Sequence, residues 1–268
     1  MNEAVEVAHA GGILTAASLM MSGSAVDDAV VRARRLPSLR VGLHLVLNDG
    51  RPLLPAASVP DLVDADGRFR SSMARTGLEM VLRPRVRRQF AAEIAAQFAA
   101  FDATGLLLDH VNCHHHFHVH PTIAGQIFEI GSRYGLRAVR VPVEPADMVK
   151  RIDASGAPSG GWLAAPWIAL LDARVRRRGL RAADRVFGLA WSGMMSEQRI
   201  AGALAQLPGG VTEMYVHPAT SCDFAGAARD YRYTDELAAL TAPGVIALVR
   251  LSGARLCGFS DLGARCDT

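Results

Sequence analysis

Short apolar runs with β-strand preference alternate along this chain with segments of helical spacing, and no other feature of the sequence constrains its fold as strongly. Strands that alternate with helices are typical of a parallel sheet covered by helices. We therefore expect an α/β protein, and the number of runs favours a (βα) barrel. The predicted strands span residues 13–20, 39–47, 106–112, 136–141, 184–189, 211–216 and 255–258.

Helix signals lie between these runs. Asn2 and Ser24 are predicted to cap the first two helices, because such side chains accept hydrogen bonds from backbone N–H groups of a first turn. Residues 85–101 carry apolar side chains at helical spacing, and Pro121 is predicted to open a further helix. The segment 48–83 is rich in Pro, Gly and Asp, so we expect a long insertion there.

The length and charge of the chain limit its organisation and its partners. Of its 268 residues 50% are hydrophobic, which is enough to bury one large core, so residues 1–268 are expected to form a single domain. The formal net charge is only +3, and the arginines are spread over predicted helix faces without an aromatic ladder. We therefore expect no nucleic-acid partner.

The cysteines and the N-terminal residues indicate the compartment. The 4 cysteines form no CxxC pair, in a chain too large to depend on disulfides. The first residues have neither a basic n-region nor an apolar h-region, and no uncharged apolar run approaches the roughly 20 residues that span a bilayer. The sequence thus predicts a cytoplasmic protein with no signal peptide and no transmembrane helix.

A histidine-rich block is the strongest local signal of chemistry. Six of the 9 histidines fall between His110 and His120, after an apolar run and before the predicted helix at Pro121. Parallel α/β proteins place their active sites at the C-terminal ends of strands, and neutral imidazole is a common ligand of zinc and similar divalent ions. The block is interpreted as a metal site, and the alternatives are a polar loop and a nonspecific metal-scavenging tract.

Two further histidines lie on or after apolar runs. His44 sits inside the run 39–47, where an imidazole needs a buried hydrogen-bond partner or a metal. His217 follows the run 211–216, in which Glu213 is a candidate supporting carboxylate. If these strands form one barrel, their C-terminal ends meet at one mouth, where imidazoles and a carboxylate can hold a metal and leave room for water.

Four blocks of the sequence resemble, in order, those of the YdjC-like (chitooligosaccharide deacetylase) family. They are GILTAASLMMSG, VGLHLVLNDGRPLLP, DHVNCHHHFHVHP and TEMYVHPAT, and the resemblance covers essentially the whole chain. GLHLVL, the histidine-rich block and the segment YRYTDELAALTAP are similar to the hopanoid-biosynthesis-associated subgroup, HpnK.

The resemblance implies a distorted (βα) TIM-like barrel whose divalent metal, zinc or magnesium, is held by His44, by His114 and by an aspartate. The family's aspartate belongs to an Asp-Asp-Phe-Gly motif that ends the first strand. That motif would precede Asn2, and Asp27 and Asp28 do not match it. The chain is therefore expected to be an N-terminally truncated member whose barrel lacks its first strand.

The implied reaction is hydrolysis of an N-acetyl group from an amino sugar or glycolipid, with an N-acetylglucosaminyl hopanoid as one substrate and acetate as product. A Lewis-acidic metal polarises the acetamide carbonyl and lowers the pKa of a bound water, which then attacks. His217 resembles the general acid that protonates the departing amine. If the block is extended, His116 and His118 alternate with His114 and are candidate supporting or substrate contacts.

Two alternatives remain open for the function and one for the surface. A sugar-binding relic without turnover would lack the metal carboxylate, and a metal-dependent phosphoesterase would need more basic residues near the histidines. The segment with Trp162, Trp167 and several arginines is either a barrel helix with a solvated end or an interfacial helix in peripheral contact with the inner membrane. The sequence does not fix the oligomeric state, and a homodimer stays open.

Overall fold

The computed structural model describes residues 1–154 and 161–262, apart from the side chains of residues 161–163. The chain divides into two compact units. The first unit comprises Met1–Ala17, Val141–Ala165 and Ala183–Gly258, and the second comprises Ser18–Arg140, Pro166–Ala182 and Phe259–Thr268. The prediction that residues 1–268 act as a single domain stays a prediction.

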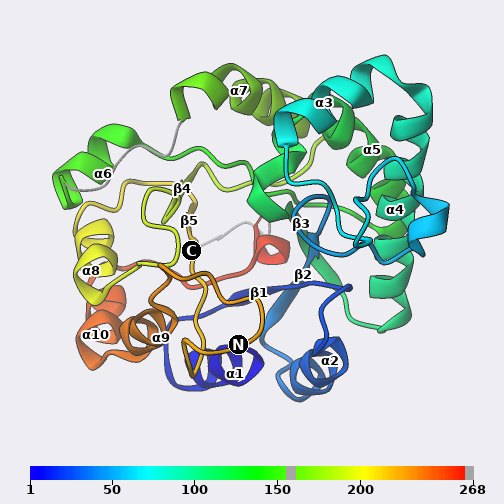
Figure 1. Ribbon diagram of the computed structural model, residues 1–268. Helices are drawn as coiled ribbons and strands as arrows, with labels where there is room; N and C mark the ends of the chain where they lie inside the picture. The colour runs from blue at the N-terminus through cyan, green and yellow to red at the C-terminus, as the bar shows by residue number, and fades with distance from the viewer. Residues whose placement is uncertain (155–160, 263–268) are drawn as a thin grey trace. The chain divides into compact units, whose positions relative to one another are not determined.

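Strands and helices alternate along the described chain, as the sequence predicts (Figure 1). The strands are β1 (Ala16–Leu19), β2 (Arg40–Leu45), β3 (Leu108–Cys113), β4 (Arg185–Phe187) and β5 (Thr212–Met214). The α-helices are α1 (Asn2–Gly11), α2 (Val26–Arg35), α3 (Met73–Leu82), α4 (Pro84–Ala103), α5 (Pro121–Gly131), α6 (Ala146–Ile152), α7 (Gly161–Arg177), α8 (Glu197–Ala205), α9 (Tyr233–Thr241) and α10 (Pro243–Leu251). Short 3₁₀ helices are η1 (Ala56–Ser58), η2 (His114–Val119), η3 (Ser132–Tyr134) and η4 (Phe259–Asp261).

The second unit is organised around parallel pairing of β2 with β3, in a sheet of strand order β1–β2–β3. The pairing places His44 opposite Asn112. Two isolated parallel bridges, Val111 with Val139 and Ala138 with Arg181, extend this pairing. The strand predicted at 136–141 is thus reduced to single bridges, and closure of the sheet into a TIM-like barrel stays a prediction.

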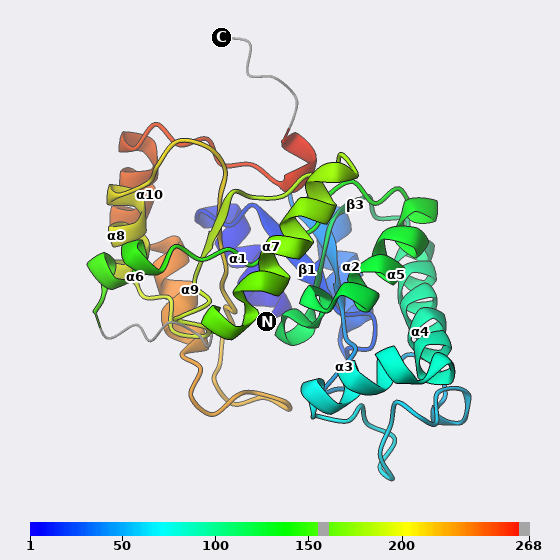
Figure 2. The same cartoon turned by 90° about the horizontal axis from the view of Figure 1, so that it is seen from above.

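Helix α4 supplies much of the core of the second unit. Phe90, Ile94, Phe98 and Phe101 are buried and recur at the spacing that puts them on one helix face. The helix contacts β2 and runs beside α5 (Figures 1 and 2). The helix predicted at 85–101 is therefore confirmed.

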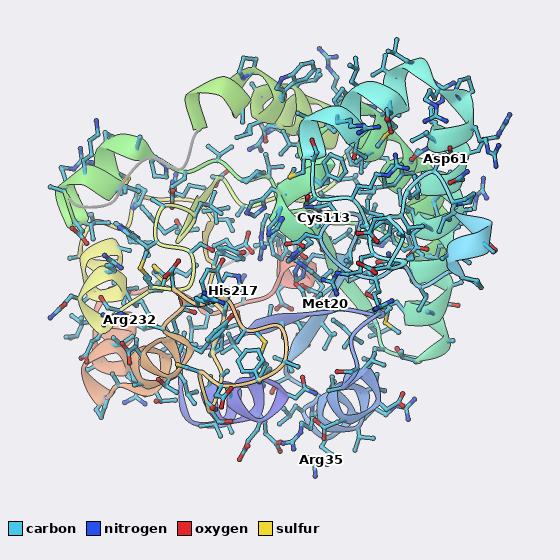
Figure 3. The ribbon with its side chains drawn as sticks, viewed as in Figure 1. Met20, Arg35, Asp61, Cys113, His217 and Arg232 are labelled. Carbon is cyan, nitrogen blue, oxygen red and sulfur yellow. The ribbon has the colours of Figure 1, made fainter. Side chains whose placement is uncertain are left out.

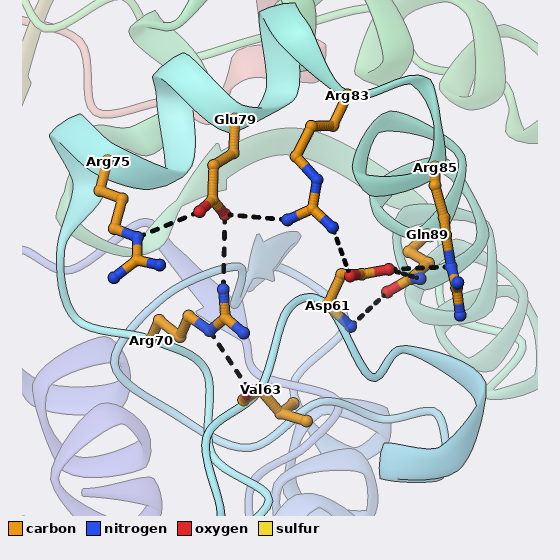
Figure 4. Close-up of polar contacts among 8 residues, drawn as sticks. All are labelled: Asp61, Val63, Arg70, Arg75, Glu79, Arg83, Arg85 and Gln89. Carbon is orange, nitrogen blue, oxygen red and sulfur yellow. Dashed lines mark hydrogen bonds and ion pairs between the residues drawn. The ribbon is translucent and has the colours of Figure 1, made fainter.

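Ion pairs connect the predicted insertion 48–83 to the start of α4 (Figure 4). Asp61 forms ion pairs with Arg83 at 2.9 Å and with Arg85 at 3.0 Å. Glu79 pairs with Arg70 at 3.4 Å and with Arg75 at 3.0 Å (Figure 4). Each of the two carboxylates thus pairs with more than one arginine, and the expectation of no nucleic-acid partner stays a prediction.

The first unit contains the parallel pair β4–β5 and a group of mutually packed helices, α8, α9 and α10. The N–H group of Val186 also donates to the carbonyl of Val143 at 2.8 Å, so the segment before α6 lies beside β4. Phe187 and Trp191 are fully buried in this core. Residues 255–258 form no strand, so that prediction is wrong; a short apolar run does not by itself find a pairing partner.

The predicted N-caps are wrong as well. Helix α1 begins at Asn2 itself, so its N-cap is Met1, and the N-cap of α2 is Ala25 rather than Ser24. Neither N-cap residue makes a side-chain capping hydrogen bond. Asp28 instead forms an i,i+4 ion pair with Arg32 at 2.9 Å, where a carboxylate in the first turn also suits the helix dipole. In contrast, Pro121 opens α5 as predicted.

The segment with the tryptophans forms α7. The side chain of Trp162 lies outside the described residues, whereas Trp167 is half exposed and Leu171 is buried. Helix α7 thus has a buried face and an apolar exposed face in its described part. No helix among the described residues is long and apolar enough to cross a membrane.

Candidate functional site

The second unit brings two of the predicted metal ligands together. His44 lies near the end of β2, and His114 follows the last residue of β3. The parallel pairing of the two strands, with His44 opposite Asn112, brings the two histidines together. The Nε2 atom of His44 is 3.4 Å from the Nδ1 atom of His114, and the two rings meet edge to face. Both imidazoles therefore present a nitrogen to one point.

The histidine-rich block forms η2 directly after Cys113, which is the last residue of β3 and is labelled in Figure 3. His115 and His116 have φ angles of 50° and 55° inside η2, a conformation that non-glycine residues rarely adopt. The run is therefore not extended, and the condition under which His116 and His118 would alternate with His114 is not met. Strained backbone of this kind persists where the surrounding structure holds it, and it clusters at functional sites.

A carboxylate joins these histidines. Asp49, His114 and His115 each offer a ligand atom, and these atoms lie within 4.8 Å of one another. Asp49 follows the loop that leaves β2 and also has a positive φ of 45°. Sequence reasoning missed Asp49 and His115 as members of the site; the signal was the turn sequence Asn-Asp-Gly directly after a strand that carries a histidine.

The protonation state of His114 suits a ligand. Burial, and secondarily the neighbouring His115, lowers the pKa of His114 to about 4. The imidazole is therefore neutral near pH 7, with a lone pair available for a cation. Imidazole nitrogens together with a carboxylate oxygen are a donor set that fits a divalent metal such as zinc.

Polar groups in the interior support His44 from behind. Asn112 is 1% exposed, and its carboxamide lies 2.6 Å from Nδ1 of His44. On its other side the carboxamide contacts the hydroxyl of Ser18 at 2.8 Å. That hydroxyl lies 3.0 Å from Nε2 of His110, whose Nδ1 is 2.8 Å from the carboxylate of Asp109.

The other histidines of the block have structural contacts. His118 is buried and donates from Nε2 to the carbonyl of Arg140 at 2.8 Å. His120 packs against Gly77 of α3, where a Cβ atom would come within 3.1 Å of the ring. The block therefore divides into residues at the candidate metal site and residues that fix the loop.

His217 belongs to the first unit, in the segment that leaves β5 (Figure 3). Its Nε2 atom lies 2.7 Å from the hydroxyl of Tyr215, and its ring packs against Tyr231. Its backbone N–H group donates to the buried carboxylate of Glu236, which also accepts from the N–H group of Met195 at 2.9 Å. Sequence reasoning found His217 but missed Glu236 and Tyr215, which hold it.

Glu236 is a carboxylic acid that is completely buried in the first unit. It is 0% exposed, and burial raises its pKa to about 7 even though its two hydrogen bonds act in the opposite direction. The predicted supporting carboxylate, Glu213, lies in β5 and is half buried. The carboxylate that holds the backbone of His217 is thus that of Glu236, which lies in α9.

Comparison with known proteins identifies the family of this chain. The pattern of the YdjC-like protein family matches residues 1–250. This chain belongs to the YdjC-like family. The YdjC-like chain is 32% identical to a mouse carbohydrate deacetylase, over 98% of this chain and 91% of that protein. It is 30% identical to a human carbohydrate deacetylase, over 98% of this chain and 87% of the human protein.

A bacterial relative and a solved structure are also similar to this chain. A carbohydrate deacetylase of Brevibacillus brevis is 36% identical over 53% of the YdjC-like chain and 52% of that relative. The structure of a candidate cellobiose-phosphate cleavage protein from Enterococcus faecalis superposes with a TM-score of 0.71, at 22% identity, over 97% of this chain and 92% of that one. The latter likeness shows a shared fold.

Proposed function

We propose that this YdjC-like protein is a metal-dependent carbohydrate deacetylase that hydrolyses the N-acetyl group of an amino sugar or glycolipid and releases acetate. The observation that carries the proposal is the convergence of His44 Nε2 and His114 Nδ1 at 3.4 Å beside the carboxylate of Asp49. The mouse, human and bacterial relatives, each a carbohydrate deacetylase by name, support it.

His44 and His114 would hold the metal, and Asp49 would complete the donor set. When bound, a divalent ion supplies Lewis acidity toward the acetamide carbonyl and lowers the pKa of a coordinated water. An imidazole-rich set favours zinc, whereas magnesium prefers oxygen ligands. The carboxylate of Asp49 would compensate part of the positive charge of the ion and so stabilise it near solvent.

His217 would act on the leaving group. A protonated imidazole can donate to the amine nitrogen as the C–N bond breaks, which prevents expulsion of an amide anion. Tyr215, at 2.7 Å from Nε2, would orient the ring, and Glu236 would fix the backbone on which the ring is carried.

Within this function we further propose a glycolipid substrate of the N-acetylglucosaminyl hopanoid type, as the likeness to the HpnK subgroup implies. The exposed Trp167 and Leu170 of α7 would then contact the cytoplasmic face of the membrane, with the arginines of its last turn near anionic headgroups. A single barrel domain, acting as a monomer or a homodimer, is part of the same proposal.

The test is acetate release from an N-acetylglucosamine oligosaccharide by the full chain, before and after chelation and after reloading with zinc or magnesium. We expect His44→Ala and His114→Ala to lose both bound metal and turnover. His217→Ala should keep the metal and lose turnover by roughly 100-fold or more. His9→Ala, in α1, is the control for loss of a histidine elsewhere.

Equal acetate release by all four variants would overturn the assignment of the site, and release that survives chelation would overturn the metal dependence. Binding of the oligosaccharide without any acetate release would identify a sugar-binding protein instead. Release of phosphate from a sugar phosphate, in place of acetate, would point to the phosphoesterase alternative.

A further inference from the structure

We propose that Asn112 is a positioning residue whose carboxamide reverses when metal binds, and that this reversal selects the tautomer of His44. The inference rests on the proposed function, because it assumes a metal ligated by His44 Nε2. It concerns three groups behind the ligand: Asn112 and Arg140, which are buried, and Ser18, which is half-buried.

One orientation of the carboxamide satisfies the metal-free protein. With the amide nitrogen toward His44, it donates to Nδ1 at 2.6 Å. The amide oxygen then accepts from both terminal guanidinium nitrogens of Arg140 at 3.2 Å and from Ser18 at 2.8 Å. The guanidinium of Arg140, which is only 7% exposed, thereby gains an acceptor in the interior.

In this orientation the remaining proton of His44 has a partner as well. A neutral imidazole has one N–H group, so accepting at Nδ1 places the hydrogen on Nε2. That hydrogen points at Nδ1 of His114, 3.4 Å away, where a ring nitrogen without a hydrogen can accept it. The chain of hydrogen bonds from Arg140 to His114 is therefore complete without a metal.

Metal binding requires the opposite orientation. Ligation by His44 Nε2 needs a lone pair there, so the hydrogen must move to Nδ1 and must find an acceptor. The oxygen of Asn112, at 2.6 Å, is an acceptor within reach when the amide nitrogen is turned toward Ser18 at 2.8 Å. The same turn brings that nitrogen against the guanidinium of Arg140, which opposes it.

A second set of groups favours the metal-binding orientation. The carboxylate of Asp109 accepts the Nδ1 hydrogen of His110, so Nε2 of His110 can accept from the hydroxyl of Ser18. The hydroxyl oxygen is then free to accept from Asn112. Asp109 is itself fixed by the backbone N–H group of Ser260 at 2.7 Å. Although burial raises it, hydrogen bonds from His110 and Ser260 lower the pKa of Asp109 to about 2.

Arg140 therefore favours the metal-free orientation of the amide, and the hydrogen-bonded chain Asp109–His110–Ser18 favours the metal-binding orientation. Metal binding selects the second of these. An aspartate at position 112 would accept from His44 and from Arg140 at the same time, so no reversal would be needed. We expect Asn112→Asp to bind zinc about 10-fold more tightly than the wild-type chain, and Asn112→Leu to bind it 10- to 100-fold more weakly.

The matched control is Asn48→Asp. Asn48 is also 1% exposed and touches a histidine of the site, at 2.9 Å from Nδ1 of His115, but it has no role in the tautomer of His44. If added negative charge alone strengthened zinc binding, Asn48→Asp would do so equally. The affinity of the four proteins for zinc alone is measured by calorimetric titration, with circular dichroism to confirm folding.

A measurement on the wild-type chain needs no variant. Long-range ¹H–¹⁵N spectra of protein labelled at histidine report which ring nitrogen of His44 carries the hydrogen. We expect it on Nε2 without zinc and on Nδ1 with zinc. A hydrogen on Nδ1 in both states, or equal zinc affinity of Asn112→Asp and Asn48→Asp, would overturn the inference while leaving the metal site intact. A wild-type chain that binds no zinc would overturn both.

Discussion

Replacement of Glu236 by glutamine isolates the energetic effect of burying a carboxylate behind His217. The side chain is 0% exposed, and burial raises its pKa from an ordinary 4.5 to about 7. A shift of this size corresponds to roughly 3 kcal/mol between the protonated and ionised forms. Glutamine is close in shape to the protonated acid and does not titrate.

The sign of the effect follows from proton linkage. Because its pKa is raised on folding, Glu236 holds a proton more tightly in the folded than in the unfolded chain. Its contribution to stability is therefore complete below pH 4.5 and is lost as pH rises through about 7. Relative to Glu236→Gln, the wild-type free energy of unfolding should fall by roughly 3 kcal/mol between pH 4 and pH 8.

Urea denaturation at several pH values, followed by tryptophan fluorescence and circular dichroism, measures this difference. Other titrating groups cancel, because both proteins contain them. Asp235→Asn is the matched control, since Asp235 is the exposed acidic neighbour in the same turn of α9. A difference between wild type and Glu236→Gln that does not vary with pH would refute the reasoning.

Two further predictions concern packing and thiol reactivity. Gly42→Ala should lower the free energy of unfolding by about 1–3 kcal/mol, because the added Cβ would lie 2.5 Å from the ring of His110. Gly209→Ala is the control, because the space around Gly209 is open and the substitution should not destabilise the chain. Thermal or urea unfolding measures both. Cys113 should resist alkylation at pH 8 until the chain unfolds, because burial raises its pKa to about 12. The exposed Cys222 should react at once. Mass spectrometry of the modified peptides distinguishes the two thiols.

Local pattern predicted much of the fold. Strand β2, strand β3 and helix α4 were found within a few residues, because apolar periodicity reports directly which face is buried. The run 136–141 carries the same pattern but forms only isolated bridges, and 255–258 forms no strand. Pairing depends on a neighbouring strand in register, which a single run of residues does not reveal.

The site was predictable where a histidine sits on a strand. His44 and His114 come together because parallel strands end at the same edge. Asp49 and the left-handed His115 were missed, since a turn conformation decides where their side chains go. Asn112 and Glu236 were missed for another reason: each acts through a buried hydrogen bond to a residue that is distant in sequence.

The central claim is that His44 and His114 bind one metal ion. Crystals of the full chain grown with zinc, and diffraction data collected on both sides of the zinc absorption edge, would locate it directly. We predict an anomalous peak about 2.0–2.1 Å from both His44 Nε2 and His114 Nδ1, with Asp49 oxygen nearby. A peak bound elsewhere, or no peak at this pair under saturating zinc, would contradict the account.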